Sequence, residues 1–316
     1  MGKAGIIYHS EKVDKKRLSA AVDEALKGLG WQPTSYYPTS FEEPGGTQAR
    51  QALRDGATVI VVAGGDGSVR HVVEALRGAD VAVGIVPLGT GNVLARNLGI
   101  QLGNLPRLVK NALLGKDHLI DVGLARMDFG DDRGKVEHIY TVMAGIGLDA
   151  KIMMNTDHRL KRRIGWIAYI DGGLKSLPVV FERMEVSVNG RPRRAIKVHS
   201  LIIGNCGFLP GNITLMPDAK LDDGILDVAA VGPRRAWNWL DFWNRVTWVS
   251  WTRNRIKAWR KIVDITANVK TLENLNGQAI DVWPANPIDI QLDGDPFGKV
   301  VGVRVEVLPK ALRVRL

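Results

Sequence analysis

Two glycine-rich turns carry the residue types that could hold a phosphate group, and each follows an apolar stretch typical of a buried strand. The first turn is GGDGS at residues 64–68, and the second is PLGTGN at residues 87–92. A glycine turn between a strand and a helix points backbone N–H groups and the positive end of the helix dipole at one place. Because the two strands are consecutive, we predict a phosphate site at the carboxyl edge of a parallel sheet.

The first turn also contains an acidic residue, Asp66, and this charge has two interpretations. Aspartate is a preferred N-cap, so Asp66 could simply begin the following helix. A carboxylate beside bound phosphates is instead stable when a cation lies between them, which predicts Mg²⁺. Neither turn has the Gly-Lys-Ser/Thr ending of a P-loop or the spaced glycines of a dinucleotide-binding turn.

The segments around these turns predict an N-terminal α/β domain. Strand-like stretches such as GIIYHS alternate with stretches whose apolar residues recur at helical spacing, for example Leu18, Val22 and Leu29. We therefore expect a three-layer, Rossmann-like domain with a parallel sheet over residues 1–121, to which residues 309–316 are a candidate addition.

The remaining residues, 122–308, contain short strand-like stretches, with an Asn-Gly hairpin signal at Asn189 and Gly190. This pattern predicts an antiparallel β-sandwich domain, so the expected fold class is α/β plus β. Two predicted helices interrupt the strands near residues 164–177 and 234–259.

The composition limits the partners and the compartment. The chain has 316 residues with 43 Lys and Arg against 33 Asp and Glu, a net charge of +10. This excess favours a polyanionic partner such as an anionic membrane, a nucleic acid or a nucleotide phosphate. The single cysteine, Cys206, excludes an internal disulfide and suits the cytoplasm. No apolar run reaches the roughly 18–20 residues that cross a bilayer, so we expect any membrane contact to be peripheral.

Five motifs, taken in order, resemble the diacylglycerol kinase catalytic-domain family, which includes bacterial lipid kinases and is related to sphingosine kinases. Besides the two glycine turns they are IDVG at residues 120–123, MPDAKLDDGILDV at residues 216–228 and LDGD at residues 292–295. The resemblance implies an ATP- and Mg²⁺-dependent lipid kinase, with diacylglycerol as the expected acceptor and phosphatidic acid as the product. It also implies that the nucleotide lies between the α/β domain and a lipid-binding sandwich.

The resemblance assigns nucleotide contacts to both glycine turns and to one earlier threonine. The residues are Thr39, Gly64, Gly65, Asp66, Gly67, Ser68, Thr90 and Asn92. Asp66 would also act in catalysis, within an acidic network around the catalytic Mg²⁺ that we extend to Asp121. The sequence departs from the family at Val93, where an aspartate is common, and at YHS in residues 8–10, where Asn-Pro is usual.

The family's Asp-Gly-Glu near the C-terminus reads Asp-Gly-Asp here, which assigns the catalytic base to Asp295. Because aspartate is one methylene shorter than glutamate, its backbone must bring it closer to the lipid hydroxyl. Without the other motifs, Asp295 would be interpreted as a hairpin-turn residue. Asp293 is expected to shape the turn or to support the metal.

The resemblance also implies a structural Mg²⁺ held by the Asp223 carboxylate and by the backbone carbonyls of Lys220 and Ile225. Oxygen-only ligation suits Mg²⁺. The alternative is an Asp-Gly turn between strands, and both interpretations can hold together.

A basic segment from Trp237 to Lys261 contains six of the nine tryptophans. Tryptophan favours the bilayer interface and basic residues favour anionic lipid, so peripheral membrane binding is one interpretation. A helix packed on its own sandwich fits equally well. Stacking on single-stranded nucleic acid fits the composition, but no RNA-binding motif accompanies it, and we expect no nucleic-acid partner. A homodimer stays open.

Two alternatives to a lipid kinase also stay open. One is a kinase of a soluble acceptor such as NAD, which would have no reason to bind liposomes. The other is a non-catalytic basic protein that binds a membrane or nucleic acid on a kinase scaffold. Such a protein would bind nucleotide through Asp66 without transferring phosphate.

Overall fold

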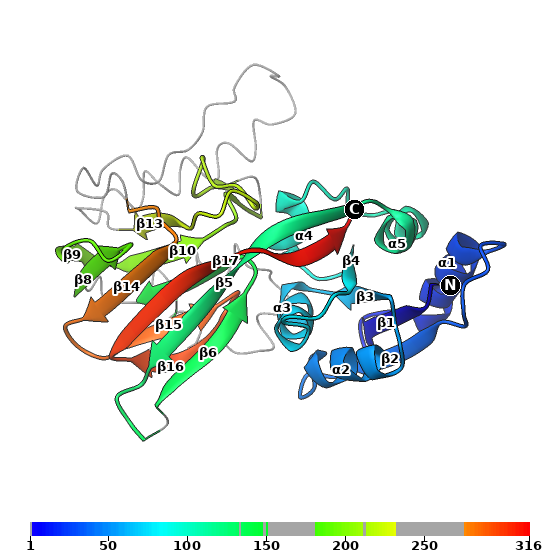
Figure 1. Cartoon of the computed structure of the whole chain (residues 1–316), viewed down its shortest axis with the longest axis horizontal. Helices are drawn as coiled ribbons and strands as arrows, with labels where there is room; N and C mark the ends of the chain where they lie inside the picture. Colours follow the sequence, from blue (N-terminus) through cyan, green and yellow to red (C-terminus); the bar gives the residue numbers. More distant parts are fainter. Residues whose placement is uncertain (1, 133, 148–149, 151–180, 211–212, 232–274) are drawn as a thin grey trace, which may run out of the picture.

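The computed structural model describes residues 2–132, 134–147, 150, 181–210, 213–231 and 275–316 (Figure 1). The helices predicted near residues 164–177 and 234–259, and with them the tryptophan-rich segment, lie outside the described residues. Within the described part of the chain, no helix is long and apolar enough to span a membrane.

The first half of the chain forms a parallel region of sheet in the order β2-β1-β3-β4. Its strands are β1 (Ala4–His9), β2 (Ser35–Thr39), β3 (Val59–Gly64) and β4 (Ala82–Pro87). Every residue of β3 and β4 is buried, as expected for apolar strands that are covered on both faces. The predicted parallel sheet is confirmed.

Helices cover both faces of this sheet. They are α1 (Lys15–Leu26), α2 (Gly46–Arg54), α3 (Asp66–Ala75), α4 (Val93–Asn97) and α5 (Leu105–Leu114). α1 and α5 pack on the face that carries Ile6 and Val61, whereas α2 and α3 pack on the face of Ile7 and Ile60. Successive strand residues point to opposite faces, so each apolar strand supplies both cores. The predicted three-layer arrangement is therefore confirmed.

The described strands of the second half pair with one another antiparallel, and β17 also pairs with β4 of the first half in parallel. Its strands are β5 (Asp117–Asp128), β6 (Lys135–Tyr140), β7 (Met143–Gly147), β8 (Glu182–Val188), β9 (Arg194–Val198), β10 (Ser200–Gly204), β11 (Phe208–Leu209), β12 (Ile213–Thr214), β13 (Asp227–Val231), β14 (Ala279–Pro284), β15 (Ile288–Leu292), β16 (Asp295–Val300) and β17 (Gly302–Arg315). A five-stranded sheet, β13-β10-β7-β15-β16, packs on the larger sheet through a buried layer that includes Ile146, Ile290, Ile280 and Val305. This arrangement is the predicted β-sandwich.

One sheet of ten strands runs through both halves, which the sequence pattern does not indicate. Figure 1 shows β5 and β17 side by side from the sandwich to the α/β region. Val303 of β17 pairs with β14, and Val314 pairs with Val83 of β4. The register of β17 against β5 shifts between Leu308 and Leu312. We propose the domain boundary at this shift, so that residues 1–121 and 309–316 form one domain and residues 122–308 the other.

Gly123 of β5 is required by the ring of Tyr140, its cross-strand partner on β6. A Cβ on Gly123 would overlap this ring, which is fully buried. We expect Gly123→Ala to destabilise the protein by about 2 kcal/mol or more, because overpacked buried positions force neighbouring atoms to shift. Chemical denaturation measures this change.

The matched control is Gly302→Ala in β17, where the nearest atom to an added Cβ would lie at 3.8 Å. This variant should unfold close to the wild-type midpoint. Equal midpoints for the two variants would show that the Tyr140 ring does not determine the choice of glycine at position 123.

Candidate active site

The two glycine turns meet at the carboxyl ends of β3 and β4. The Leu88 N–H donates to the Gly64 carbonyl at 2.9 Å. A Cβ on Gly89 would lie 2.5 Å from the Cα of Gly65. The two turns can therefore come this close only because residue 89 is a glycine. Ser68 lies over Gly64, whose added Cβ would stand 3.0 Å from the Ser68 hydroxyl oxygen. The predicted turns therefore form one continuous surface of backbone.

Asp66 is the first residue of α3, and its N-cap is Gly65. The interpretation of Asp66 as the N-cap of its own helix is thus wrong. Its carboxylate instead faces the second turn, where Oδ1 accepts a hydrogen bond from the Leu94 N–H of α4 at 3.3 Å. Burial raises the pKa of Asp66 to about 6, with a further contribution from the nearby Asp293. Backbone N–H groups at the start of α4 offset part of this pKa rise.

Asn92 shapes the second turn from within. It adopts a left-handed conformation with φ 48° and is buried. Its Oδ1 accepts from the Gly89 N–H at 3.0 Å, and its Nδ2 donates to the Gly89 carbonyl at 2.8 Å. Both ends of the side-chain amide are therefore occupied by the turn, while Thr90, at the tip of the same turn, is exposed.

Thr39 ends β2 at the same edge of the sheet. Ser10, after β1, donates to the Thr39 carbonyl from its N–H at 3.2 Å and from its hydroxyl at 3.0 Å. The Thr39 side chain is 2% exposed, and its hydroxyl has no hydrogen-bond partner among the described residues. Buried hydroxyls are usually paired, so this one is an exception at the predicted ligand edge.

Asp295, the predicted base, begins β16 and reaches the first glycine turn from the other domain. A Cβ on Gly67 would lie 3.9 Å from Asp295 Oδ2. The same oxygen accepts hydrogen bonds from Arg70 Nε at 3.2 Å and from Arg70 Nη2 at 2.7 Å. The Nε2 atom of His71 lies 3.8 Å from it. The structure thus brings Asp295 to the phosphate turn.

Two charged residues of α3, Arg70 and Glu74, were not among the predicted site residues. Arg70 Nη1 donates to Glu74 Oε2 at 3.3 Å. Glu74 Oε1 contacts β6, where it pairs with His138 Nδ1 at 2.8 Å and accepts from the Ile139 N–H at 3.2 Å. With Asp66 these charged residues recur every four positions along α3, and this spacing is the signal that could have identified them.

Asp293 joins the turn before β16 to residues 141–143. It is a turn residue with φ 50°, and its carboxylate accepts from the N–H groups of Thr141, Val142 and Met143 at 2.7, 2.9 and 3.0 Å. The Thr141 hydroxyl donates a fourth bond at 2.9 Å. Burial raises the pKa of Asp293, and these hydrogen bonds partly offset the rise. The expectation that Asp293 shapes the turn agrees with these contacts.

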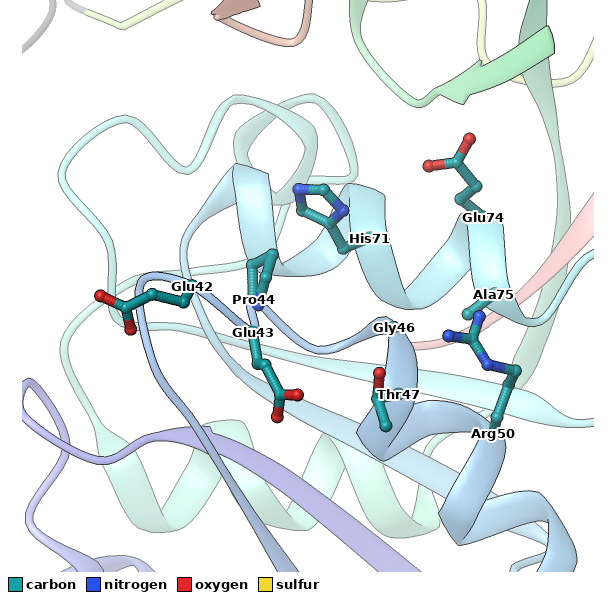
Figure 2. Close-up of a pocket in the computed structure, with 9 residues that line it drawn as sticks. All are labelled: Glu42, Glu43, Pro44, Gly46, Thr47, Arg50, His71, Glu74 and Ala75. Carbon is teal, nitrogen blue, oxygen red and sulfur yellow. The ribbon is translucent and has the colours of Figure 1, made fainter. Parts of the chain in front are cut away.

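A cavity of about 400 Å³ adjoins the Arg70 region (Figure 2). Figure 2 shows that its lining comes from the segment after β2, from the first turns of α2 and from helix α3. Its lining residues are Glu42, Glu43, Pro44, Gly46, Thr47, Arg50, His71, Glu74 and Ala75. Burial lowers the pKa of His71, followed by the charge of Arg70, so the imidazole is neutral at pH 7. The lining is therefore mainly acidic and hydrogen-bonding.

We expected Asp121 in the acidic network around Asp66, but its carboxylate is bonded to the loop of Asp223 and to β17. Its Oδ2 accepts from the Gly224 N–H and its Oδ1 from the Lys310 N–H, both at 2.7 Å. Its own N–H donates to the Leu221 carbonyl at 2.7 Å. Asp121 thus anchors the loop of the predicted structural metal to β5 and β17, and both of its carboxylate oxygens are used.

The predicted metal loop is exposed. Asp223 Oδ1 accepts from the Ile225 N–H at 3.1 Å, and Lys220 precedes it in the same loop. Burial raises the pKa of Asp227 to about 6, with further contributions from Asp223 and Asp218. In the part of the chain described here, no group of three or more His, Cys, Asp or Glu side chains is arranged to hold a metal ion. A site of one carboxylate and two carbonyls remains compatible with this loop.

The raised pKa of Asp66 predicts how stability depends on pH. Because its folded-state value of about 6 exceeds the ordinary 3.8, ionisation favours unfolding, and stability is lost as the pH rises through 6. Without nucleotide and metal, we expect Asp66→Asn to stabilise the protein by about 1–3 kcal/mol at pH 7.5. The gain should fall to less than half at pH 4.5. Thermal unfolding at both pH values measures it.

Asp80→Asn is the control for this experiment, since Asp80 is 85% exposed. It should change stability little at either pH. A gain for Asp66→Asn that is equal at the two pH values, or a loss at pH 7.5, would contradict the electrostatic account of Asp66.

Comparison with known proteins relates both halves of the chain to lipid kinases. Residues 3–125 match the diacylglycerol kinase catalytic domain, and residues 141–316 match the YegS C-terminal NAD kinase beta sandwich-like domain. A Pseudomonas fluorescens protein named "Probable lipid kinase YegS-like" is 28% identical over 99% of this chain and 95% of its own. A Pseudomonas aeruginosa protein of the same name is 31% identical over 84% of this chain and 79% of its own.

Solved structures share the fold. A diacylglycerol kinase from Bacillus anthracis str. Sterne gives a TM-score of 0.72 at 19% identity, over 99% of this chain and 96% of its own. Yeast NADH kinase complexed with NADH gives a TM-score of 0.52 at 9% identity, over 99% of this chain and 82% of its own. At these identities the likeness shows the fold alone.

Proposed function

The chain belongs to the family of YegS-like lipid kinases, and we propose that it transfers the γ-phosphate of ATP to the hydroxyl of diacylglycerol, giving phosphatidic acid. The position of Asp295 is the observation that supports this proposal. Asp295 of the sandwich lies beside Gly67 of the phosphate turn, with 3.9 Å between its Oδ2 and a Cβ placed on Gly67. A carboxylate next to a phosphate cradle is the arrangement that a hydroxyl kinase needs, because the acceptor must lose a proton where the phosphate arrives.

The two turns and the adjoining cavity suit different parts of a nucleotide. Backbone N–H groups of the turns, from Gly64 to Ser68 and around Thr90, would hold the phosphates. The cavity contains Glu42, Glu43 and Glu74, which repel phosphate but accept hydrogen bonds from ribose hydroxyls and a purine amine. We assign the nucleoside to the cavity.

A divalent cation fits the carboxylate of Asp66. The fit rests on the charges of this region: burial and the nearby Asp293 carboxylate both raise the pKa of Asp66, so a cation would stabilise its ionised form. Oxygen donors of this kind suit Mg²⁺. When bound there with nucleotide, the ion would neutralise charge on the phosphates. Because Val93, just after the second turn, stands where the family commonly has an aspartate, Asp66 is the acidic residue available beside the two glycine turns.

The residues of the chain divide the reaction between them. Asp295 accepts the proton of the acceptor hydroxyl while the oxygen of that hydroxyl forms a bond to the γ-phosphorus. The bond from the γ-phosphorus to the bridging oxygen breaks, and that oxygen leaves on ADP. N–H groups of the two glycine turns stabilise the charge on the phosphate oxygens during this transfer.

We also propose that the protein binds to the surface of a membrane. The net charge of +10 and the segment from Trp237 to Lys261 support peripheral binding to an anionic lipid surface, where the acceptor is found. We propose a cytoplasmic location for the same reason that the sequence suggested it, the single cysteine. A homodimer is compatible with these features.

Asp295→Ala should abolish lipid phosphorylation. Purified protein with labelled ATP, Mg²⁺ and mixed micelles of diacylglycerol should give labelled phosphatidic acid, and the variant should lose about 10²–10⁴-fold in kcat because the proton acceptor is gone. Thin-layer chromatography of the lipid fraction measures the product.

Asp80→Ala, an exposed change at a residue outside the five motifs, is the control and should keep wild-type activity. Parallel reactions contain NAD or other lipids as acceptor, and liposome flotation accompanies them. Label on NAD without flotation would favour a soluble-acceptor kinase. Nucleotide binding that needs Asp66 but gives no labelled product with any acceptor would favour a non-catalytic protein.

Asp223→Ala should remove the effect of Mg²⁺ on stability. Without nucleotide, an ion bound by Asp223 and the carbonyls of Lys220 and Ile225 stabilises the folded chain, so millimolar Mg²⁺ should raise the melting temperature of the wild type. The neighbouring Asp222→Ala is the matched control and should keep this rise. An undiminished rise in Asp223→Ala would exclude Asp223 as the ligand.

A further inference from the structure

Arg70 is a charged side chain that the fold buries at the boundary between the proposed domains. It is 2% exposed, and arginine is rarely so buried unless its charge is paired. The guanidinium meets two carboxylates, Asp295 of β16 and Glu74 one turn further along α3. Of these two, Asp295 is the one that borders the glycine turn at Gly67.

The hydrogen bonds from Arg70 are unequally divided between the two oxygens of Asp295. Nε and Nη2 both donate to Oδ2, at 3.2 and 2.7 Å. No residue in the described ranges donates to Oδ1. The Asp295 side chain is 37% exposed, so a substrate can reach the carboxylate. One oxygen therefore fixes the side chain, and the other is available to accept a proton.

Helix α3 connects this contact to the phosphate turn. Asp66, Arg70 and Glu74 are spaced by four residues and share one face of the helix. Glu74 is in turn held on β6 by His138 and by the Ile139 N–H. Because residues on one helix move together, α3 sets the spacing between the glycine turn and Asp295.

An aromatic ring lies beside the guanidinium. Arg70 Cζ lies 5.5 Å from the ring centroid of Phe297. The His138 ring packs on Phe297, with 4.6 Å between the two ring centroids. A cation at this distance over an aromatic face is attracted to it, so this contact helps the ion pairs to hold Arg70 in place.

We propose that Arg70 is a positioning residue for phosphate transfer, which anchors Asp295 through Oδ2 beside Gly67 and leaves Oδ1 to accept the proton of the acceptor hydroxyl. This inference rests on the proposed function, because it takes Asp295 as the base. Lysine would keep the charge, but an ammonium group lacks the rigid planar fork that fixes the carboxylate. The role therefore belongs to the guanidinium geometry as well as to its charge.

The test compares Arg70→Met with Arg77→Met in the lipid kinase assay. Arg77 is the matched control, because it lies just after α3 and pairs with Glu137 of β6 at 3.1 Å, but is 48% exposed. We expect Arg70→Met to lower kcat by about 10²-fold, as small misplacements of a reacting group do. The KM for ATP should change much less than kcat, since Arg70 itself does not line the cavity assigned to the nucleoside. Arg77→Met should match the wild type, and Arg70→Lys should recover part of the loss.

The same change in an Asp295→Asn background separates positioning from general support of the fold. If Arg70 acts through Asp295, Arg70→Met should cause no further loss of kcat there. A further hundredfold loss in that background would overturn the proposal. A folded Arg70→Met enzyme with wild-type kcat would also overturn it.

Crystal structures of the wild type and of Arg70→Met give a readout that does not depend on activity. We expect the Asp295 carboxylate to leave its place beside Gly67 in the variant. A carboxylate that keeps its place overturns the proposal, whatever the acceptor. If the wild type phosphorylates no acceptor while the carboxylate moves in the variant, the proposed function fails, and with it the role in phosphate transfer, but the anchoring of the Asp295 carboxylate by Arg70 stands.

Discussion

The ion pair between Arg70 and Asp295 is the contact on which the candidate site depends. Its members are 225 residues apart, and it joins helix α3 to strand β16. Removing one partner of a buried pair leaves an uncompensated charge and typically costs about 3–5 kcal/mol. Here the arginine is 2% exposed and the aspartate 37%, so the desolvation cost falls mainly on Arg70. The aspartate stays accessible, which is what a base that meets a substrate requires.

A second constraint is the negative charge that the fold concentrates beside this pair. Asp66 faces the second glycine turn. Burial is the main cause of its raised pKa, and the nearby Asp293 carboxylate raises it further. Asp293 is stabilised by four hydrogen bonds from residues 141–143, whereas Asp66 has backbone N–H groups at the start of α4. A fold selected for stability alone would not ionise a carboxylate in such a place. Perturbed acids of this kind are typical of sites that bind cations or handle protons.

The elements that sequence patterns predicted are those with strong apolar signals. β3 and β4 are continuous apolar strands, and α5 has a clear apolar face, so length and period were enough. β2 and α2 were not predicted. β2 is an edge strand of five residues that contains Pro38, and α2 buries only the small side chains of Ala49 and Ala52. The single ten-stranded sheet was also missed, because pairing between β17 and β4 depends on residues more than 200 positions apart.

For the site, the sequence by itself located the two glycine turns, the acid within the first of them and the aspartate to which the family resemblance assigns the role of base, because these signals are local and motif-like. The tertiary structure decided how they are used. It turned Asp66 away from its own helix cap toward α4, placed Asp121 on the loop of Asp223, and buried Arg70 against Asp295. The physical reason is that charge pairing and burial depend on which distant segments the fold brings together, and local spacing does not contain that information.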